Sequence, residues 1–496
     1  MTDAALAFDL GTGGCKAALV DLEARVVATA FVAYPTSYPA PGRHEQRPDD
    51  WWDAVARSAR EVLTLDGGRH RVVAVGISGQ SLALVPVDGS GAALLDAVPI
   101  WSDIRGEDAA AAYFGSGDGD AAWYLRTGNG FPRGMYTVFK AAWLRAAHPD
   151  VAARTALVLG SKDWVNARLT GVALTDPSYA SGSGAYDLAT RRMLPDVLAG
   201  LDVPAGWWPA IVPSREVVGH VTAPAAAATG IPAGVPVVAG GVDNACMALG
   251  AGLDRPGEAY ISLGSSNWVT VAGESPVLDA VTRPFVFDHV LPGLTISALS
   301  TFGGGSSLTW LAGTLGRGDD LDALLDEAAA APVGARGLTC VPTLAGGTVA
   351  EGGPAVRGAL LGLDLGHTHG DLARAVVEGI GFSLAGAARA ILADAPSAAE
   401  ITATGGGARG GLLLQVLADL LGRPVVRPEA AQHCAALGAA ALALIGTGAW
   451  ADTAPLRAAR RAAARAEPRP DLAAAYDQPR ARFDAARLAT RAHASP

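Results

Sequence analysis

A carboxylate followed by a turn of small residues stands near the start of the chain. The stretch AFDLGTGGCKAA places Asp9 at the end of an apolar run, just before three closely spaced glycines. Such a turn points successive backbone N–H groups toward one place, which makes an anion cradle without bulky side chains. The candidates for binding phosphate are Gly11, Thr12, Gly13 and the mobile cation Lys16. Asp9 is a candidate for Mg²⁺, which keeps several waters and uses one or two carboxylates. On these residues alone, a tight hairpin with a capping aspartate is an equally good interpretation.

A second candidate carboxylate, Asp243, lies in the bend GGVDNA, after the strand-like run VPVVAG. A carboxylate in a glycine-flanked bend can face a cleft between domains. There it could act as a general base that takes the proton from a substrate hydroxyl as the hydroxyl attacks phosphorus. The alternative is that Asp243 caps the helix NACMALGAG, and taken in isolation this structural interpretation is the stronger one.

Two further glycine turns lie in the second half of the chain. The turn LGSSN follows a strand-like run, as the first turn does, and offers Gly264, Ser265 and Ser266. Two such turns in matching places indicate paired clamps on a polyphosphate. The stretch TGGGARGG offers Gly406, Gly407 and Arg409, which suit the adenosine or the phosphates of a nucleotide.

The stretch TGGGARGG also leaves an alternative open. It fits G-x-G-x-x-G between a strand and a helix, with Glu429 about 20 residues further on, which is typical of an NAD-dependent oxidoreductase. Its position near the end of the chain, rather than at the start of a βαβαβ unit, argues against that reading. No Gly-Lys pair occurs in the sequence, so a Walker-type phosphate loop is excluded.

Composition narrows the class of protein. The 496 residues are half hydrophobic and carry a net charge of −10, which indicates more than one globular domain and argues against nucleic acid as a partner. The four cysteines are far apart, as expected of reduced thiols in the cytoplasm. The longest uncharged stretch, from Cys434 to Trp450, is rich in Ala and Gly and predicts a buried helix rather than a membrane span. We therefore expect a cytoplasmic protein with no membrane partner.

The pattern of strands predicts a duplicated α/β fold. Residues 1–34 hold three apolar runs that predict antiparallel hairpins, and PDDWWDAVARSAREVLTL predicts an amphipathic helix. A similar layout returns at residue 259, with AYISLG, a small turn and WVTVAG, so the second half reads as a diverged copy of the first. The predicted division is residues 1–244, residues 245–450 and a helical tail, residues 451–496, which we expect to cover the first domain.

Taken in order, the motifs of this chain resemble those of the FGGY carbohydrate kinases, within the actin-like sugar-kinase superfamily. The resemblance covers nearly the whole chain. It rests on FDLGTGGCK, HEQRPDDWW, PIWSDIR, SKDWVNARLTG, GGVDNA, ISLGSS, GALLGLDLGHTHGDLARAVVEG and TGGGARG. Among the family, the chain is most similar to the xylulokinase-like group.

This resemblance implies two RNase H-like domains that close a central cleft over ATP, Mg²⁺ and a sugar or polyol, with a homodimer as the expected assembly. Asp243 would be the catalytic base and Asp9 would act with the metal. The three glycine turns would hold the nucleotide, with TGGGARG near the adenosine. The substrate-binding residues implied are Gln80, Ser81, Trp101, Asp103, Asp243 and Asn244.

The expected reaction is phosphorylation of a small ketose, foremost a pentulose such as D-xylulose, which would give xylulose 5-phosphate and ADP. Two departures keep alternatives open. Leu82 stands where xylulokinases typically have a histidine, so the acceptor could be ribulose, L-xylulose, a hexulose, erythritol or glycerol. The stretch AGGTVAEGGP lacks the family's arginine, which leaves a sugar-binding protein without transfer activity as a further alternative.

Overall fold

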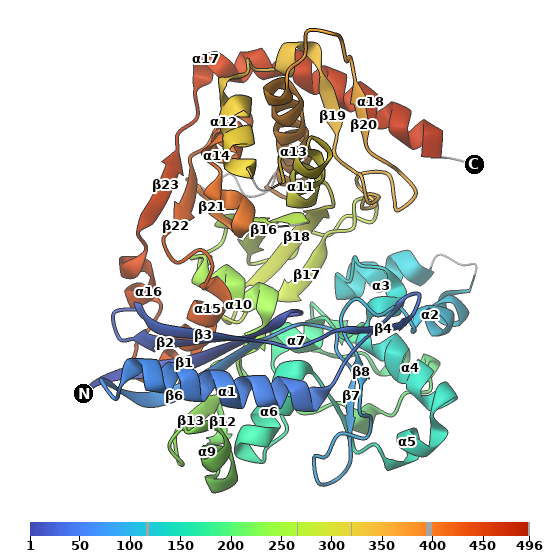
Figure 1. The fold of residues 1–496 in the computed structure, drawn as a ribbon. Coiled ribbons are helices and arrows are strands. Elements are labelled where there is room, and N and C mark those ends of the chain that lie inside the picture. The colour runs from blue at the N-terminus through green and yellow to red at the C-terminus, as the bar shows by residue number, and fades with distance from the viewer. Residues whose placement is uncertain (116–118, 265, 319, 393–398, 495–496) are drawn as a thin grey trace.

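The computed structural model describes residues 1–115, 119–264, 266–318, 320–392 and 399–494. Two lobes face each other, each built on a mixed seven-stranded sheet, and the helices α10 (Asp243–Gly250) and α15 (Cys434–Gly446) lie between them (Figure 1). The predicted α/β fold with two similar domains is therefore confirmed.

The first sheet has the strand order β12-β13-β6-β1-β2-β3, and β14 pairs in parallel with β6. The hairpins β1–β2 and β2–β3 are antiparallel, as the alternating apolar runs predict, and β6 is parallel to β1. Its strands are β1 (Thr2–Leu10), β2 (Gly14–Asp21), β3 (Val26–Ala33), β6 (His70–Gly79), β12 (Val217–His220), β13 (Pro236–Val238) and β14 (Gly241–Val242).

The second sheet repeats this topology. Its order is β17-β18-β16-β15-β21-β22-β23, with β15, β16 and β18 antiparallel and with β21 parallel to β15, as β6 is to β1. Six strands match, because the order β12-β13-β6-β1-β2-β3 corresponds to β23-β22-β21-β15-β16-β18, and this explains why the two halves open with the same pattern. The strands are β15 (Ala259–Leu263), β16 (Asn267–Gly273), β17 (Phe285–Asp288), β18 (Thr295–Thr301), β21 (Ile401–Thr404), β22 (Val425–Pro428) and β23 (Ala462–Ala466).

Strand alternation decides which side chains face the space between the lobes. On β1, Leu6 and Phe8 pack in the core beneath α1 (Pro48–Asp66), while Ala5 and Ala7 pack toward α10 and α15. Because side chains alternate, Asp9 belongs to the same face as Ala5 and Ala7. The strand thus ends with a carboxylate directed toward the partner lobe.

The helices α10 and α15 form a layer shared by the two sheets. One hydrophobic cluster joins these helices to β1 and β2 of the first sheet and to β15, β16 and β18 of the second. The two helices approach closely through glycines, since a Cβ at Gly250 would lie 1.8 Å from the Cys434 carbonyl oxygen and one at Gly438 would lie 2.0 Å from that of Cys246. The predicted domain boundary after residue 244 falls inside α10, and α15 packs on the first sheet although it belongs to the second half of the sequence.

An insertion of short elements extends the first lobe. It holds the small sheets β4-β5-β8, β7-β9 and β10-β11. Residues 43–46 form a strand that pairs with β4 and β8. The bounds are β4 (Ser37–Ala40), β5 (Arg43–Gln46), β7 (Val85–Val87), β8 (Val98–Pro99), β9 (Leu157–Leu159), β10 (Tyr186–Asp187), β11 (Arg192–Met193), α2 (Glu107–Phe114), α3 (Gly119–Thr127), α4 (Thr137–Ala147), α5 (Pro149–Arg154), α6 (Ser161–Thr170), α7 (Pro177–Ser181), α8 (Pro195–Gly200) and α9 (Ala223–Thr229), with 3₁₀ turns at Arg133–Met135 and Ala205–Trp207.

The outer face of the second sheet is covered by α13 (His369–Leu392), and the helices α11, α12, α14 and α18 belong to the same hydrophobic cluster. In the described part of the chain, α13 alone is long and apolar enough to span a bilayer, and 78% of its apolar window is buried, as expected of a core helix. The other elements are α11 (Gly305–Thr314), α12 (Leu321–Ala330), α14 (Gly411–Leu421), β19 (Thr339–Val341) and β20 (Ala359–Leu361), with 3₁₀ turns at Ala335–Gly337 and Gly406–Arg409.

The C-terminal tail differs from its prediction in two ways. It is not wholly helical, because residues 462–466 form β23, which pairs with β22. Its last helix, α18 (Asp477–Ala494), packs on β19 and β20 of the second lobe rather than on the first domain (Figure 1). The tail's other elements are α16 (Ala454–Ala459), α17 (Pro470–Ala473) and a 3₁₀ turn at Ala474–Tyr476.

The glycine contact between α10 and α15 predicts a stability effect. Gly438→Ala should lower the free energy of unfolding by about 1–3 kcal/mol, because the new methyl group forces two backbones apart. Thermal melting of the purified protein measures the change. The matched control is Gly386→Ala in α13, where a Cβ meets no atom within 4 Å and the helix should gain stability by up to about 1 kcal/mol. Equal melting temperatures for Gly438→Ala and the unchanged protein would contradict the packing described.

Candidate active site

Asp9 lies at the end of β1, on the face turned toward the second lobe. The Ser78 hydroxyl donates to Asp9 Oδ1 at 3.1 Å, and Lys16 is its register partner on β2. Burial raises the pKa of Asp9, and both Lys16 and the Ser78 hydroxyl oppose that rise. Because the hydrogen bond uses one carboxylate oxygen, the carboxylate still offers acceptor capacity to the cleft.

Asp243 is the first residue of α10 and comes directly after β14. Because β1, β6 and β14 run parallel, with Asp9 beside Ser78 and Gly241 beside Ser78 in register, the two carboxylates lie at one edge of the sheet. The Asn244 N–H donates to Asp243 Oδ1 at 2.8 Å. Burial and the nearby Asp9 raise the pKa of Asp243 to about 7. A carboxyl group with this pKa exchanges a proton near neutral pH, as a general base must.

A buried ion cluster holds the loop that carries Asp243. The Lys162 ammonium lies 2.5 Å from Asp163 Oδ1 and 2.9 Å from Asp176 Oδ1, and it donates to the Ala239 carbonyl oxygen at 3.2 Å. Ser178, whose hydroxyl donates to Asp176, accepts the Val242 N–H at 2.9 Å. The segment before Asp243 is thus bound at both ends to the interior of the first lobe.

The first glycine turn is held from one side and open on the other. The Gln46 amide donates to the Thr12 carbonyl oxygen at 2.7 Å, and the Trp101 indole donates to the Thr12 hydroxyl at 2.9 Å. A Cβ at Gly13 would meet no atom within 4 Å, so packing inside the protein does not require glycine there. This open side leaves room for a ligand to approach the backbone of residues 11–13.

A cavity of about 400 Å³ lies between the two lobes beside Asp9 and Lys16, which flank this turn. Gly11, Thr12, Gly13 and Asp243 are not among the described residues that line it. Lys16 Nζ donates to the Gln432 carbonyl oxygen of the second lobe at 2.6 Å. The candidate site residues from the sequence analysis that line it are Asp9, Lys16, Gly406 and Arg409, together with Glu429, which belonged to the dinucleotide alternative. Sequence reasoning missed Ser262, Arg427 and Gln432; the only signal for Arg427 was its place at the end of a strand beside the TGGGARGG strand.

Of the other small residues in the two turns of the second lobe, Gly405 lines the cavity. At φ +84°, Gly405 passes so close to β15 that a Cβ would lie 2.4 Å from the Leu263 carbonyl oxygen, which explains part of the glycine run. Gly264, Ser266 and Gly407 are not among the described residues that line the cavity, although Gly407 also contacts Leu263 closely. Ser265 lies outside the described residues.

Gln80 and Trp101 lie on the other side of the first turn. Gln80 Nε2 donates to Gln46 Oε1 at 2.7 Å, so Gln46 links Gln80 to Thr12. Gln80 Oε1 is buried and has no hydrogen-bond partner in the described part of the chain, which leaves an acceptor for a ligand hydroxyl. Ser81 and Asn244 are 8% and 7% exposed, and Trp101 is half-buried.

Asp103 does not have the role expected of it. Its side chain is fully buried, and its oxygens accept from the Arg105 guanidinium at 2.7 and 2.8 Å and from the His44 N–H at 2.7 Å. Arg105 also pairs with Glu45 at 2.6 Å. Asp103 therefore fixes the segment that carries Trp101 and cannot itself touch a sugar.

The loop AGGTVAEGGP, which lacks the family's arginine, is held by the buried Glu351 and by contacts from α18. Glu351 is 5% exposed and accepts the N–H groups of Phe302 and Thr348 at 2.9 and 3.0 Å. Arg487 and Arg491 of α18 donate to the Ala350 carbonyl oxygen. The tail thus supplies, from a distant part of the sequence, the cations that hold this loop.

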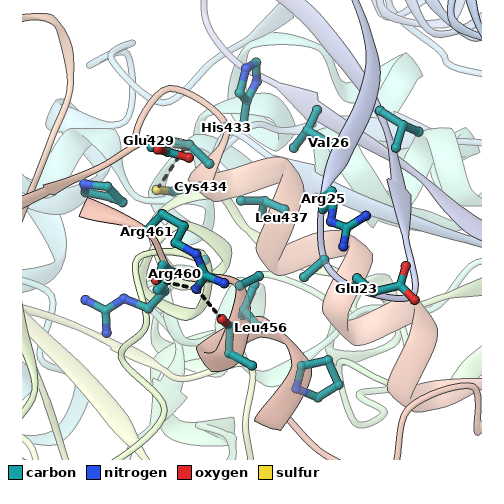
Figure 2. A pocket seen from close by; sticks show the side chains of 18 of the residues that line it. Glu23, Arg25, Val26, Glu429, His433, Cys434, Leu437, Leu456, Arg460 and Arg461 are labelled. Atoms are coloured by element: carbon teal, nitrogen blue, oxygen red, sulfur yellow. Dashed lines mark hydrogen bonds between the residues drawn. The ribbon is translucent and has the colours of Figure 1, made fainter. Parts of the chain in front are cut away.

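A larger cavity, of about 960 Å³, lies beside the smaller one between the β2–β3 turn and α16, and shares Glu429 and Cys434 with it. Figure 2 shows its apolar floor, with Leu437 and Leu456, and charged groups of both signs around it. None of the candidate catalytic or phosphate-binding residues lines this cavity among the described residues, so we place the active site in the smaller one.

A duplicated RNase H-like sheet with two acidic residues at the cleft between the lobes defines a phosphotransferase of the actin-like ATPase fold. The models of the FGGY family of carbohydrate kinases match residues 4–250, for the N-terminal domain, and residues 259–447, for the C-terminal domain. The chain belongs to this family and is a carbohydrate kinase, with ATP and a sugar as its small-molecule partners. The dinucleotide alternative for TGGGARGG falls with this assignment, since the strand before it lies in a sheet with an antiparallel β15–β16 hairpin.

Several relatives are similar over nearly the whole chain. The xylulose kinase of Bacillus subtilis is 30% identical over 444 residues, covering 89% of this chain and 88% of that protein. The glycerol kinase of Gloeobacter violaceus is 32% identical over 472 residues, covering 93% and 91%. The crystal structure of the xylulose kinase from Rhodospirillum rubrum matches with a TM-score of 0.89 and 32% identity over 99% of each chain.

The two cavities make different predictions for nucleotide binding. Lys16→Met should raise the KM for ATP at least tenfold, because it removes a cation from the smaller cavity and the bond that joins the lobes there. Steady-state kinetics at saturating sugar measure this. The matched control is Arg25→Met, which lies on the larger cavity and should change the KM for ATP by less than twofold. The reverse pattern would show that the nucleotide occupies the larger cavity.

Proposed function

We propose that the protein transfers the γ-phosphoryl group of ATP to a hydroxyl of a small ketose, with a pentulose such as D-xylulose as the preferred acceptor. The observation that carries the proposal is the pairing of Asp9 and Asp243 at one edge of the cleft, with the pKa of Asp243 raised to about 7. Relatives named xylulose kinase support the pentulose. The glycerol kinase relative and the apolar Leu82 keep another ketose or a polyol as the second candidate.

In this mechanism, the ionised Asp243 carboxylate accepts the proton of the acceptor hydroxyl. The hydroxyl oxygen then forms its bond to the γ-phosphorus while the bond from that phosphorus to the bridging oxygen breaks, and ADP leaves. Catalysis comes mainly from positioning and charge stabilisation. The buried cluster around Lys162 keeps the carboxylate in place, which reduces the reorganisation needed at the moment of transfer.

The residues fit Mg²⁺ in the manner of a mostly hydrated ion. In the described part of the chain, no cluster of three or more His, Cys, Asp and Glu side chains could form a full metal cage. Asp9 has an oxygen left after its bond from Ser78, and one carboxylate with waters and phosphates is a usual Mg²⁺ environment. Bound through Asp9, the ion would neutralise phosphate charge.

The nucleotide would lie along the smaller cavity. We assign its phosphates to the backbone of Gly11, Thr12 and Gly13, to Lys16 and, from the second lobe, to the turn of Gly264, Ser265 and Ser266. Gly406, Gly407 and Arg409 would lie near the adenosine. The acceptor would lie beyond Asp243, in contact with Gln80, Ser81, Trp101 and Asn244.

A panel of acceptors tests the proposal directly. With ATP and Mg²⁺, ADP release should be stimulated by a pentulose more than by hexuloses, glycerol or erythritol, as a coupled assay measures. A polyol as the best acceptor would favour the second candidate. Absence of stimulation by every sugar and polyol, with thermal stabilisation by one of them, would instead indicate a binding protein without transfer activity.

Asp243→Asn should lower kcat with the best acceptor by about 10²–10⁴-fold, since the amide cannot take up the proton. The KM values should change little, because the side chain keeps its size. Asp196→Asn, which removes an exposed partner of Arg126, serves as the control and should keep the original kcat. A kcat for Asp243→Asn close to that of the unchanged protein would rule out Asp243 as the base.

A further inference from the structure

Lys140, in α4, is a lysine that the proposed mechanism does not use. Only three of the 38 basic residues are lysines, and Lys140 is fully buried. Its Nζ donates to the carbonyl oxygens of Leu82, at 3.0 Å, and Ile100, at 2.6 Å. No ion pair to Lys140 is found within the described residues, and the charged groups that act on it are Asp103 and Arg105. The ammonium is thus held by two backbone carbonyls alone.

These two carbonyls belong to the two segments assigned to the acceptor. Leu82 follows Gln80 and Ser81, and Ile100 precedes Trp101. Close to the ammonium, the Leu84 N–H donates to the Pro99 carbonyl oxygen at 3.1 Å. Lys140 therefore links the two backbone segments that carry the proposed acceptor-binding side chains. We expect that loss of its Nζ would change the distance between these two segments.

The buried Lys140 ammonium and the backbone conformation of Leu82 both cost folding free energy. A buried ammonium loses its hydration, and two carbonyl oxygens replace only part of it. Leu82 has a φ of +59°, a left-handed conformation that a leucine rarely adopts. A glycine at residue 82 would avoid the strain, whereas an apolar side chain at residue 140 would remove the buried charge but would take a donor from both carbonyl oxygens. The strain at Leu82 and the buried charge of Lys140 occur where the Leu82 and Ile100 segments meet. We infer that the distance between these two segments matters for function.

We propose that Lys140 is a positioning residue for the acceptor, which fixes the Gln80–Ser81 segment against Trp101 from behind the pocket. This inference rests on the proposed location of the acceptor. It predicts an effect on the acceptor and not on the nucleotide, because Lys140 does not line the nucleotide cavity.

The charge of Lys140 provides a readout that a merely structural side chain lacks. Burial lowers the pKa of Lys140 to about 7, although Asp103 opposes the shift. Below pH 7 the ammonium makes charge-assisted bonds to both carbonyls, and above pH 7 the neutral amine donates more weakly. The KM for the acceptor should therefore rise two- to fivefold between pH 6 and pH 8.5, while the KM for ATP stays constant.

Lys140→Met tests the proposal, because methionine has a similar length and no donor. The KM for the best acceptor should rise at least tenfold, the KM for ATP should stay within twofold, and the acceptor KM should depend less on pH than it does in the unchanged protein. The matched control on the same helix is Arg145→Met, which removes a surface pair with Asp202 and should leave both KM values within twofold.

Three outcomes would overturn the proposal. A folded Lys140→Met protein with an unchanged acceptor KM would do so, and so would one in which both KM values rise equally. If the variant does not fold, the pH dependence of the unchanged protein is the test. An acceptor KM that stays constant from pH 6 to pH 8.5 would contradict the proposal. Failure of the proposed function appears separately, as a lack of turnover by the unchanged protein with every acceptor.

Discussion

The parallel alignment of β1, β6 and β14 is the constraint on which the active site depends. It brings the carboxyl ends of three strands to one edge of the first sheet, so that Asp9 and the first residue of α10, Asp243, lie near each other. Burial, and after it the neighbouring Asp9 carboxylate, raise the pKa of Asp243 to about 7. The geometry that assembles the site thus also gives Asp243 a pKa suited to a general base.

The duplicated fold extends this arrangement to a second wall. Because β15 and β21 repeat the relation of β1 to β6, the second lobe presents Ser262, Thr404 and the following glycines to the same cavity. The layer of α10 and α15 belongs to both cores. The helix that begins with Asp243 therefore packs against both sheets, so both lobes determine the position of the base.

Much of this could be predicted from the sequence, because the signals are local. Alternation along β1 and β2, the small residues after Asp9 and their repetition near residue 263 predict the duplicated hairpins, while the binding of phosphate at those turns stays a prediction. Tertiary contacts decided the rest. Asp103 reads as a sugar ligand until Arg105 and His44 are seen to occupy its oxygens. The sequence of the tail predicts a helix that covers the first domain. In the structure, β23 instead pairs with β22, and Arg487 of α18 donates to the loop that contains Glu351. Arg427 carries no motif, and only the fold brings it to the cavity.

The central claim is that Asp243 accepts the proton during transfer, and the pH dependence of that step tests it most directly. The rate of phosphoryl transfer in a single turnover, with ATP and the best acceptor saturating, separates chemistry from product release. We predict that this rate rises with pH below about 7 and levels off above it, because the carboxylate must be ionised to act. A single-turnover rate that is constant, or that falls, from pH 5.5 to pH 8.5 would contradict the account.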